Sequence, residues 1–137
     1  MRKALRIKTV MTPFPYSVDA AAPLERARAL MGEHGIHHLP VKRGDEIAGV
    51  VALRDLGPPV GDVGRTVSEV ASGDPYVVDI NARLDEVALT MAERHVDCAL
   101  VTRDGHLAGL FTTTDACRLL GEHLRTLAPP PPDDDVA

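Results

Sequence analysis

The sequence predicts an α/β protein made of two copies of one β-α-β-β-α unit, and three observations lead to this fold class. Residues 10–56 align on residues 70–116 without a gap, with 14 identities in 47 positions. Each copy contains short apolar runs and one stretch with apolar residues at helical spacing, which is typical of alternating strands and helices. Hydrophobic residues make up 45% of the 137 residues but aromatic residues only 3%, so an aliphatic core is expected.

Each copy is expected to begin with a short strand and a helix. The strands are predicted around Tyr16–Val18 and Tyr76–Val78. Pro23 suits the first position of the first helix, and Asn81 precedes the second helix. Apolar residues at helical spacing then predict one buried face on each helix. These residues are Leu24, Ala27, Leu30 and Met31 in the first copy, and Leu84, Val87, Ala88 and Met91 in the second.

Two apolar strands joined by a tight turn are predicted to follow each helix. The strands are Leu39–Val41 and Ile47–Val51 in the first copy, and Ala99–Val101 and Leu107–Phe111 in the second. Glycine and aspartate between the paired strands supply turn chemistry. The turn sequences are Arg43-Gly44-Asp45 and Arg103-Asp104-Gly105. Each copy is therefore expected to contain a β-hairpin.

The last helix of the unit is expected to be complete only in the second copy. After Asp115, leucines continue at helical spacing for about three turns. After Asp55 the chain reads Leu-Gly-Pro-Pro, which a helix does not easily cross, so about one turn or no helix is expected there. The predicted division places the first copy at residues 7–60, the second at 61–127, and an extended or disordered tail rich in proline and aspartate at 128–137.

The composition limits the classes of function. A formal net charge of −5 and a pI of about 5.6 argue against a nucleic-acid partner, because nucleic-acid binders present a basic face. Cys98 and Cys117 are too few for a disulfide framework and fit a reducing compartment. No apolar run approaches the roughly 20 residues of a membrane span, and the first residues lack the features of a signal peptide. A cytoplasmic protein without a membrane partner is expected.

The duplicated unit resembles the CBS domain pair, a family named after cystathionine β-synthase. Four kinds of stretch carry the resemblance, which covers residues 7 to about 125. They are Val10-Met11-Thr12, the helical stripe from Leu24 to Met31, His38-Leu39-Pro40-Val41, and Gly49 to Asp55 or Gly109 to Asp115. The resemblance implies two small sheets with flanking helices, packed with pseudo-two-fold symmetry, and two clefts between the copies.

The resemblance also implies a stand-alone regulatory module that is not an enzyme. The clefts of such pairs typically take an adenosine nucleotide or a related ligand: AMP, ADP, ATP or S-adenosylmethionine. No cofactor is required. The ligand is expected to bridge both copies and to stabilise one relative orientation, which an effector protein, unknown from the sequence, would read. The resemblance further implies a homodimer formed through helices.

The stretch from Gly109 to Asp115 carries the chemistry that an adenosine ligand needs. A carboxylate at a helix start can accept hydrogen bonds from both ribose hydroxyls. Threonine hydroxyls beside free N–H groups suit a phosphate. We therefore predict nucleotide-binding roles for Thr112, Thr114 and Asp115. The resemblance adds residues of the other copy that complete this cleft, namely Thr12, Ser17, Val18 and Ile36.

A second, weaker cleft is predicted around the aspartate of the first copy. Its predicted residues are His37, His38, Arg54, Asp55, Val78 and Val96. The basic side chains predict that it tolerates anions, although Ala52 replaces the usual hydroxyl. In the second copy, Asp97 and Cys98 occupy the equivalent basic positions, which predicts a ligand with little phosphate beside Asp115.

Two other interpretations remain open from the residues alone. In the first interpretation, the chain is a purely structural dimerisation module, in which Asp55 and Asp115 cap helices and bind no ligand. His34, His37 and His38 suggest a metal-binding stress protein, since histidines three or four residues apart can share a metal. A catalytic site is not expected, because the sequence has no nucleophile elbow, phosphate-binding loop, H-E-x-x-H or C-x-x-C motif.

Overall fold

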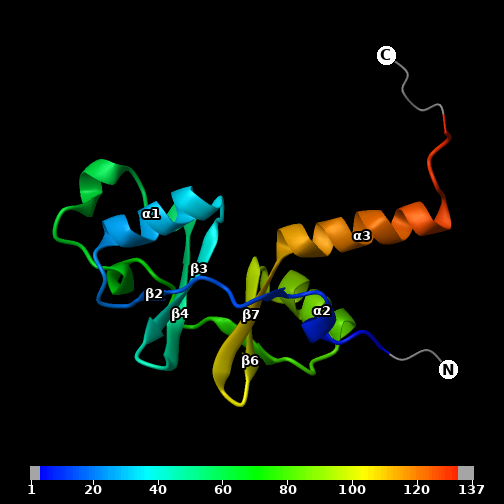
Figure 1. Ribbon diagram of the computed structural model, residues 1–137, viewed down its shortest axis with the longest axis horizontal. Coiled ribbons are helices and arrows are strands. Elements are labelled where there is room, and N and C mark those ends of the chain that lie inside the picture. The colour runs from blue at the N-terminus through cyan, green and yellow to red at the C-terminus, as the bar shows by residue number, and fades with distance from the viewer. Residues whose placement is uncertain (1–3, 133–137) are drawn as a thin grey trace.

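The computed structural model describes residues 4–132 and has two small sheets, lying side by side along the long axis of the molecule (Figure 1). One sheet has the strand order β2-β3-β4, formed by Val18–Asp19, His38–Arg43 and Glu46–Ala52. The other has the order β1-β7-β6-β5, formed by Thr12–Pro13, His106–Thr112, Cys98–Arg103 and Tyr76–Asp79. The predicted α/β fold class is confirmed, and each predicted strand overlaps an observed one.

Each sheet carries one helix of eleven residues, α1 at Leu24–His34 and α2 at Leu84–Arg94. The predicted stripe on α1 is buried in the first core. Pro23 is the residue that caps α1 rather than its first helical residue, because its ψ of 149° is extended. Gly35, with a φ of 61°, ends α1 in the left-handed conformation that glycine adopts at low energetic cost.

The two hairpins have the same register, so the duplication seen in the sequence extends to the strand pairing. His38 pairs with Ala52 in β3 and β4, and Cys98 pairs with Thr112 in β6 and β7. Both hairpins have an irregularity immediately after Val41 or Val101. A shift of 60 residues therefore relates equivalent positions of the two copies.

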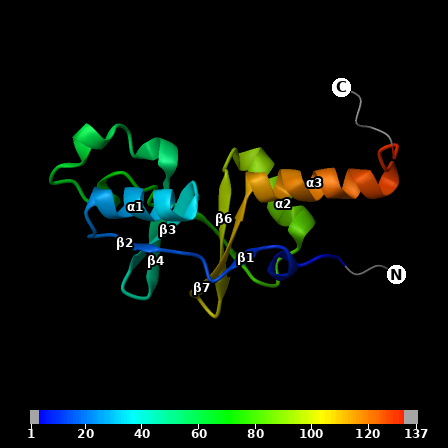
Figure 2. The same ribbon diagram turned by 45° about the horizontal axis from the view of Figure 1, so that its top comes forward.

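The N-terminal segments of the two copies are exchanged. A short 3₁₀ turn η1 (Ile7–Thr9) and strand β1 begin the first copy but pack on the second, where Ile7 is buried. The equivalent turn η4 (Val67–Glu69) packs on the first copy, where Val67 is buried. Figure 2 shows both segments crossing between the halves. Packing contacts thus cross the predicted boundary between residues 60 and 61. This boundary stays a prediction about the sequence repeat.

The closing helices differ between the copies, as predicted. The second copy ends in the long helix α3 (Thr113–Leu127), whereas the first has only the 3₁₀ turn η2 (Leu53–Asp55). A further 3₁₀ turn, η3 (Pro59–Asp62), follows it. Residues 128–132 form neither helix nor strand, and the rest of the predicted tail, 133–137, lies outside the described residues. Between residues 4 and 132, no helix is long and apolar enough to cross a membrane.

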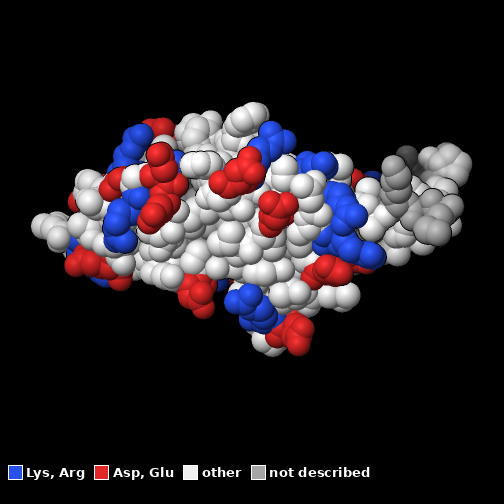
Figure 3. Space-filling view, turned by 90° about the horizontal axis from the view of Figure 1, so that it is seen from below, with Lys and Arg blue, Asp and Glu red and all other residues white. Residues whose placement is uncertain are grey.

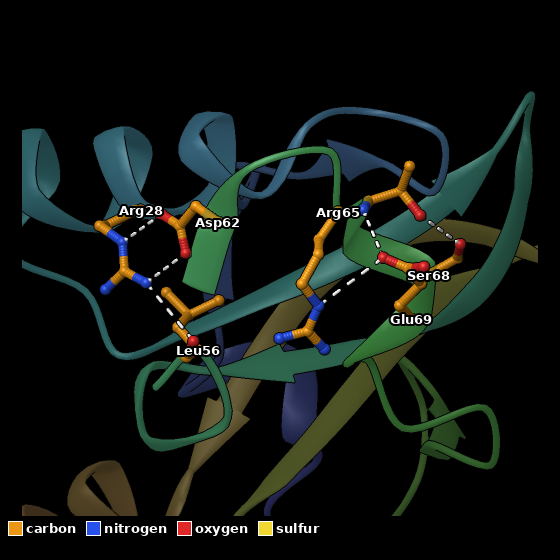
Figure 4. A network of polar contacts seen from close by, with 7 residues as sticks. Arg28, Leu56, Asp62, Arg65, Ser68 and Glu69 are labelled. Carbon is orange, nitrogen blue, oxygen red and sulfur yellow. Dashed lines mark hydrogen bonds and ion pairs between the residues drawn. The ribbon is translucent and has the colours of Figure 1, made fainter. Parts of the chain in front are cut away.

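A partly buried ion pair fixes the segment that replaces the missing helix (Figure 4). Nε and Nη2 of Arg28 on α1 each donate to a carboxylate oxygen of Asp62, both at 2.8 Å. Arg28 also donates to the carbonyl oxygen of Leu56 at 3.4 Å. Farther along the segment, Glu69 accepts a hydrogen bond from the backbone N–H of Thr66 at 2.8 Å. Polar contacts with Arg28 thus hold the residues from Leu56 to Asp62 against α1.

We expect Asp62→Ala to lower the melting temperature at neutral pH, because it leaves the guanidinium of Arg28 without its buried partner. Hydrogen bonds from Arg28 hold the pKa of Asp62 below its usual range. The stabilisation is therefore present at neutral pH and is lost as the pH falls through that lowered pKa. Thermal melts from about pH 7 down to about pH 3 should show the two proteins converging. A pH-independent difference, or an equal effect of Asp45→Ala in an exposed turn, would contradict this role.

Candidate functional site

Two clefts lie between the copies, one beside each C-terminal aspartate. The Asp115 cleft has a volume of about 390 Å³, and the Asp55 cleft one of about 160 Å³. A central hollow of about 390 Å³ lies between them, and Ala52, Leu53 and Thr113 form part of its wall. Each cleft is built from both copies, as the resemblance implies.

The duplication relates the two clefts residue by residue. Nine lining positions of one have a counterpart 60 residues away in the other. In the Asp55 cleft these positions are Val50, Ala52, Arg54, Asp55, Ser72, His95, Val96, Asp97 and Cys98. In the same order, their counterparts in the Asp115 cleft are Leu110, Thr112, Thr114, Asp115, Thr12, Gly35, Ile36, His37 and His38. The clefts therefore share one architecture and differ in chemistry.

The carboxylate of Asp115 is held at the start of α3. Its Oδ2 accepts hydrogen bonds from the backbone N–H of Thr112 at 2.9 Å and from the Thr112 hydroxyl at 3.1 Å. Its Oδ1 receives one at 3.3 Å from the exposed guanidinium of Arg118. A carboxylate has about four lone-pair sites, so Oδ1 keeps acceptor capacity toward the cleft. The helix-cap interpretation is thus correct in part: Asp115 supports the cap, and Thr112 is the capping residue.

The first turn of α3 offers fewer free donors than the sequence suggests. The N–H of Thr113 donates to the carbonyl oxygen of Asp97 at 2.9 Å, and the N–H of Asp115 donates to the Thr112 hydroxyl at 3.3 Å. Thr112 is therefore occupied by the cap. Thr114 is exposed and lines the cleft, so its hydroxyl and N–H are the groups of this turn that face a ligand.

Arg118 is a cleft residue that sequence reasoning missed. It lies three residues after Asp115 on α3 and lines the same cleft. Because residues three apart on a helix are neighbours, the helical spacing was the signal that could have identified it. Arg118 adds a positive charge at the place where the ribose and phosphate of a nucleotide are expected.

The two histidines lie closer to Asp115 than predicted. His37 lines the Asp115 cleft and the central hollow, not the Asp55 cleft. His38 lines both clefts. The loop before β3 lies beside the end of β7 of the other copy, so His37 and His38 line the Asp115 cleft together with Ile36. That the histidines belong to the same copy as Asp55 was misleading.

His38 carries a buried polar atom without a partner. Its Nε2 has no hydrogen bond to any described residue. Burial lowers the pKa of His38, opposed by the charge of Asp97. The imidazole is therefore neutral at pH 7 and offers one unused donor or acceptor where the clefts meet.

The Asp55 cleft is the more acidic of the two. Asp55, Asp74 and Asp97 all line it, and Arg54 is the main cation. Nη1 of Arg54 forms an ion pair with Oδ2 of Asp97 at 2.6 Å, so its charge is already compensated. Burial raises the pKa of the Cys98 thiol to about 12, which keeps this thiol protonated. The structure thus places the basic groups at the Asp115 cleft, the reverse of the predicted ranking for anions.

Besides His37, three predicted residues do not line their clefts. Val18 on β2 pairs with Val41 and points into the first core, and Ser17 precedes it without reaching the Asp115 cleft. Val78 on β5 packs against the second core rather than lining the Asp55 cleft. Both valines occupy strands that pair in parallel with β3 or β6, and the inward side of such a strand belongs to the core. Thr12, Ile36 and Val96 do line the clefts as predicted.

The three histidines proposed as metal ligands do not converge. The ring of His34 stacks on Tyr16 with centroids 3.7 Å apart, whereas His37 and His38 line the Asp115 cleft. Within the part of the chain that the structure describes, no three His, Cys, Asp or Glu side chains are grouped to hold a metal. His34 therefore has a packing role in this structure.

A duplicated α/β unit with exchanged N-terminal segments and two equivalent clefts defines a tandem-repeat module. The family model of the CBS domain matches residues 7–56 and 67–122, so the chain belongs to the CBS domain family. The resemblance found in the sequence is confirmed, and the order of strands and helices follows it.

Two curated relatives illustrate how the unit is used in different contexts. The chain is 31% identical over 116 residues to inosine-5'-monophosphate dehydrogenase of Thermoplasma acidophilum; the match covers 84% of the chain and 24% of that enzyme. The chain therefore spans about a quarter of the length of this relative. It is 32% identical over 106 residues to Hypoxic response protein 1 of Mycobacterium tuberculosis, covering 73% of the chain and 74% of the relative.

Two solved structures have the same fold and bind different ligands. The CBS domain of the bacterial CNNM/CorC family Mg²⁺ transporter in complex with ATP is 31% identical, with a TM-score of 0.74, and covers 82% of this chain and 84% of that one. Hypoxic Response Protein I with two coordinated zinc ions is 28% identical, with a TM-score of 0.72, and covers 83% and 98%.

Proposed function

We propose that the chain is a regulatory module that binds an adenosine nucleotide in the Asp115 cleft. The observation that carries the proposal is the composition of this cleft: a ribose-accepting carboxylate, a threonine hydroxyl and basic side chains meet an apolar wall drawn from both copies. The similarity to a CBS domain solved with ATP supports the same ligand class. S-adenosylmethionine fits less well, because it lacks a phosphate for the basic groups.

The geometry suggests one orientation of the nucleotide. The purine would lie against Ile36 and Leu110, which supply the apolar wall. The ribose hydroxyls would donate to Oδ1 of Asp115. The phosphates would extend toward the histidines at the central hollow, where the unpartnered Nε2 of His38 can donate to an anion. The ligand would then touch both copies at once.

The proposed mechanism is non-catalytic and requires no cofactor. A ligand that contacts both copies stabilises one relative orientation, and an effector protein that prefers this orientation is favoured by the ligand's differential affinity. The Cys98 thiol, a candidate nucleophile near the clefts, stays protonated because burial raises its pKa to about 12. We also propose a cytoplasmic location, since Cys98 and Cys117 are free thiols.

Calorimetric titration with AMP, ADP, ATP and S-adenosylmethionine tests the function. We expect saturable binding of the phosphate-bearing ligands and weaker binding of S-adenosylmethionine. A ligand at a hundred times its dissociation constant should also stabilise the protein by about 2.7 kcal/mol in a melt. The variant His37→Asp installs the residue found at the equivalent position of the Asp55 cleft. It should weaken the binding of ATP more than the binding of adenosine. No binding by any of the four ligands would refute the proposal.

Because the related Hypoxic Response Protein I was solved with zinc ions, zinc should be included in the same titration. The dispersed histidines argue against a metal site of the kind suggested by the sequence. We therefore expect zinc to leave the melting temperature unchanged and His34→Ala to leave nucleotide binding unchanged. Zinc binding that is lost in His37→Ala would instead favour the metal-binding alternative.

We further propose that the module forms a homodimer through α3. Leu120, Leu124 and Leu127 are 58%, 52% and 69% exposed and follow each other at helical spacing. An exposed apolar stripe of this kind marks an interaction surface, and a second copy offers the same stripe. Figure 1 shows α3 extending beyond the sheets, where a second helix has access to it.

Leu124→Glu should convert the proposed dimer into a monomer, because it buries a carboxylate at the centre of the stripe. Light scattering after size exclusion measures the mass directly. Glu122→Lys, on another side of α3, is the matched control and should remain dimeric. A wild-type protein that is monomeric at all concentrations would contradict the proposal.

A further inference from the structure

A further cavity, which we call the outer pocket, lies outside both clefts and the central hollow. It has a volume of about 570 Å³, larger than either cleft, and sits where β1 meets the β6–β7 hairpin. Its apolar wall consists of Met11, Pro13, Phe14, Ile80, Leu107 and Ala108. Viewed from the side of the hairpin tips, charged side chains surround a broad uncharged area of the surface (Figure 3). A volume of several hundred Å³ is typical of small-molecule sites.

Phe14 is held in an unusual conformation at the edge of this pocket. Its ring is 93% exposed, and its φ of 48° lies in the left-handed region, which bulky residues rarely adopt. The backbone N–H of Phe14 donates to the carbonyl oxygen of Ala108 at 3.2 Å, which fixes the residue against β7. A strained residue whose side chain contributes nothing to the core points to a functional role.

The rim of the outer pocket is positively charged in an acidic protein. Lys8, Arg103 and His106 line it together with one acid, Asp104. Among the described residues, neither Lys8 nor Arg103 takes part in an ion pair. The Nζ of Lys8 donates to the side-chain oxygen of Asn81 at 3.1 Å, which positions the amine without neutralising it. The rim is therefore complementary to an anion.

The internal duplication supplies a control surface. The equivalent surface on the β2-β3-β4 sheet has the same hairpin register but different side chains. Five residues of the outer pocket show this difference. They are Lys8, Met11, Phe14, Ile80 and His106, and their counterparts 60 positions away, in the same order, are Ser68, Ala71, Asp74, Ala20 and Glu46. Each of these five differences makes the outer pocket more apolar, larger or more basic than the equivalent surface. Since both surfaces support the same fold, folding alone does not require the residues of the outer pocket.

We propose that the outer pocket binds a small organic anion with an apolar body, such as a medium-chain or aromatic carboxylate. The apolar wall would take the body of the ligand and the exposed ring of Phe14 would cover it. The carboxylate would lie at the rim, where Lys8 and Arg103 can donate charge-assisted hydrogen bonds. This site is independent of the nucleotide cleft.

Octanoate is the first probe, with octylamine and octanol as matched controls of charge. Calorimetry and displacement of the fluorescent anion anilinonaphthalene sulfonate should show saturable binding of octanoate. Octanol and octylamine should bind at least about tenfold more weakly than octanoate. Equal binding of all three would overturn the proposal, because it would indicate a non-specific apolar surface.

The substitutions come from the control surface. Phe14→Asp, Lys8→Ser and His106→Glu each install the residue of the equivalent surface, and each should weaken octanoate binding about tenfold or more. Phe14→Asp should also keep or raise the melting temperature, since aspartate tolerates the left-handed conformation better than phenylalanine. Asp115→Ala should leave octanoate binding unchanged, which separates this site from the nucleotide cleft. Octanoate binding that survives all three rim and wall substitutions would refute the proposal.

Discussion

Gly49→Ala is expected to destabilise the protein by about 3 kcal/mol, the largest effect on folding that we predict for a single methyl group. A Cβ at Gly49 on β4 would collide with the backbone carbonyl of Ser72. This carbonyl accepts a hydrogen bond from the N–H of Val50 at 3.1 Å, and the N–H of Ser72 donates back at 2.9 Å. Because the obstacle is backbone, the exchanged segment has to move and both bonds are disturbed.

Gly109→Ala is the matched control, since Gly109 occupies the same position on β7. A Cβ there would meet the sulfur and neighbouring carbons of Met11. This flexible side chain can change rotamer, so a loss of only about 1 kcal/mol is expected. Urea unfolding of both variants measures the difference, with equal m-values as the check on two-state behaviour. Equal losses would show that the contact between Gly49 and Ser72 does not limit packing.

The duplication made most of the fold predictable. A gapless repeat at 60 residues implies that both copies have the same strands, helix and hairpin, and the shared register of the two hairpins confirms it. The loss of the closing helix after Asp55 also followed from Gly57 and the prolines after it. These features depend on local backbone preferences and on periodicity, which a sequence displays directly.

The assignment of residues to clefts was only partly predictable. Thr12 and Ile36 were placed correctly beside Asp115, because the pattern of the family includes contributions from the other copy. His37 was placed in the wrong cleft, because it belongs to the same copy as Asp55. Its side chain instead faces the opposite copy, an arrangement produced by tertiary packing. The charge of each cleft therefore has to be judged from the three-dimensional structure.

Two other features could not be predicted from the sequence. The left-handed φ of Phe14 is imposed by the meeting of β1 and β7, which are distant in the chain. The unpartnered Nε2 of His38 depends on how closely the copies pack. Both are consequences of contacts between segments far apart in sequence, and both lie at surfaces for which we propose ligands. Deviations from local rules are expected to gather at such functional sites.

Asp115→Ala is expected to weaken nucleotide binding about tenfold to a hundredfold, the largest effect on function that we predict. Charge-assisted hydrogen bonds from ribose hydroxyls contribute about 1.5–3 kcal/mol each, and about 1.4 kcal/mol corresponds to tenfold in affinity. The substitution also removes the acceptor for the N–H of Thr112, so a loss of stability of about 1 kcal/mol accompanies it. Calorimetry well below the melting temperature separates the two effects.

Asp55→Ala is the control that makes this result specific. Asp55 also accepts a hydrogen bond from a backbone N–H, that of Ala52 at 3.1 Å, so its loss disturbs an equivalent turn. Its cleft has less than half the volume and more acidic groups. We therefore expect Asp55→Ala to leave nucleotide affinity nearly unchanged. Weakening by Asp55→Ala and not by Asp115→Ala would move the nucleotide to the smaller cleft, and equal weakening by both would indicate that the two clefts act together through His38.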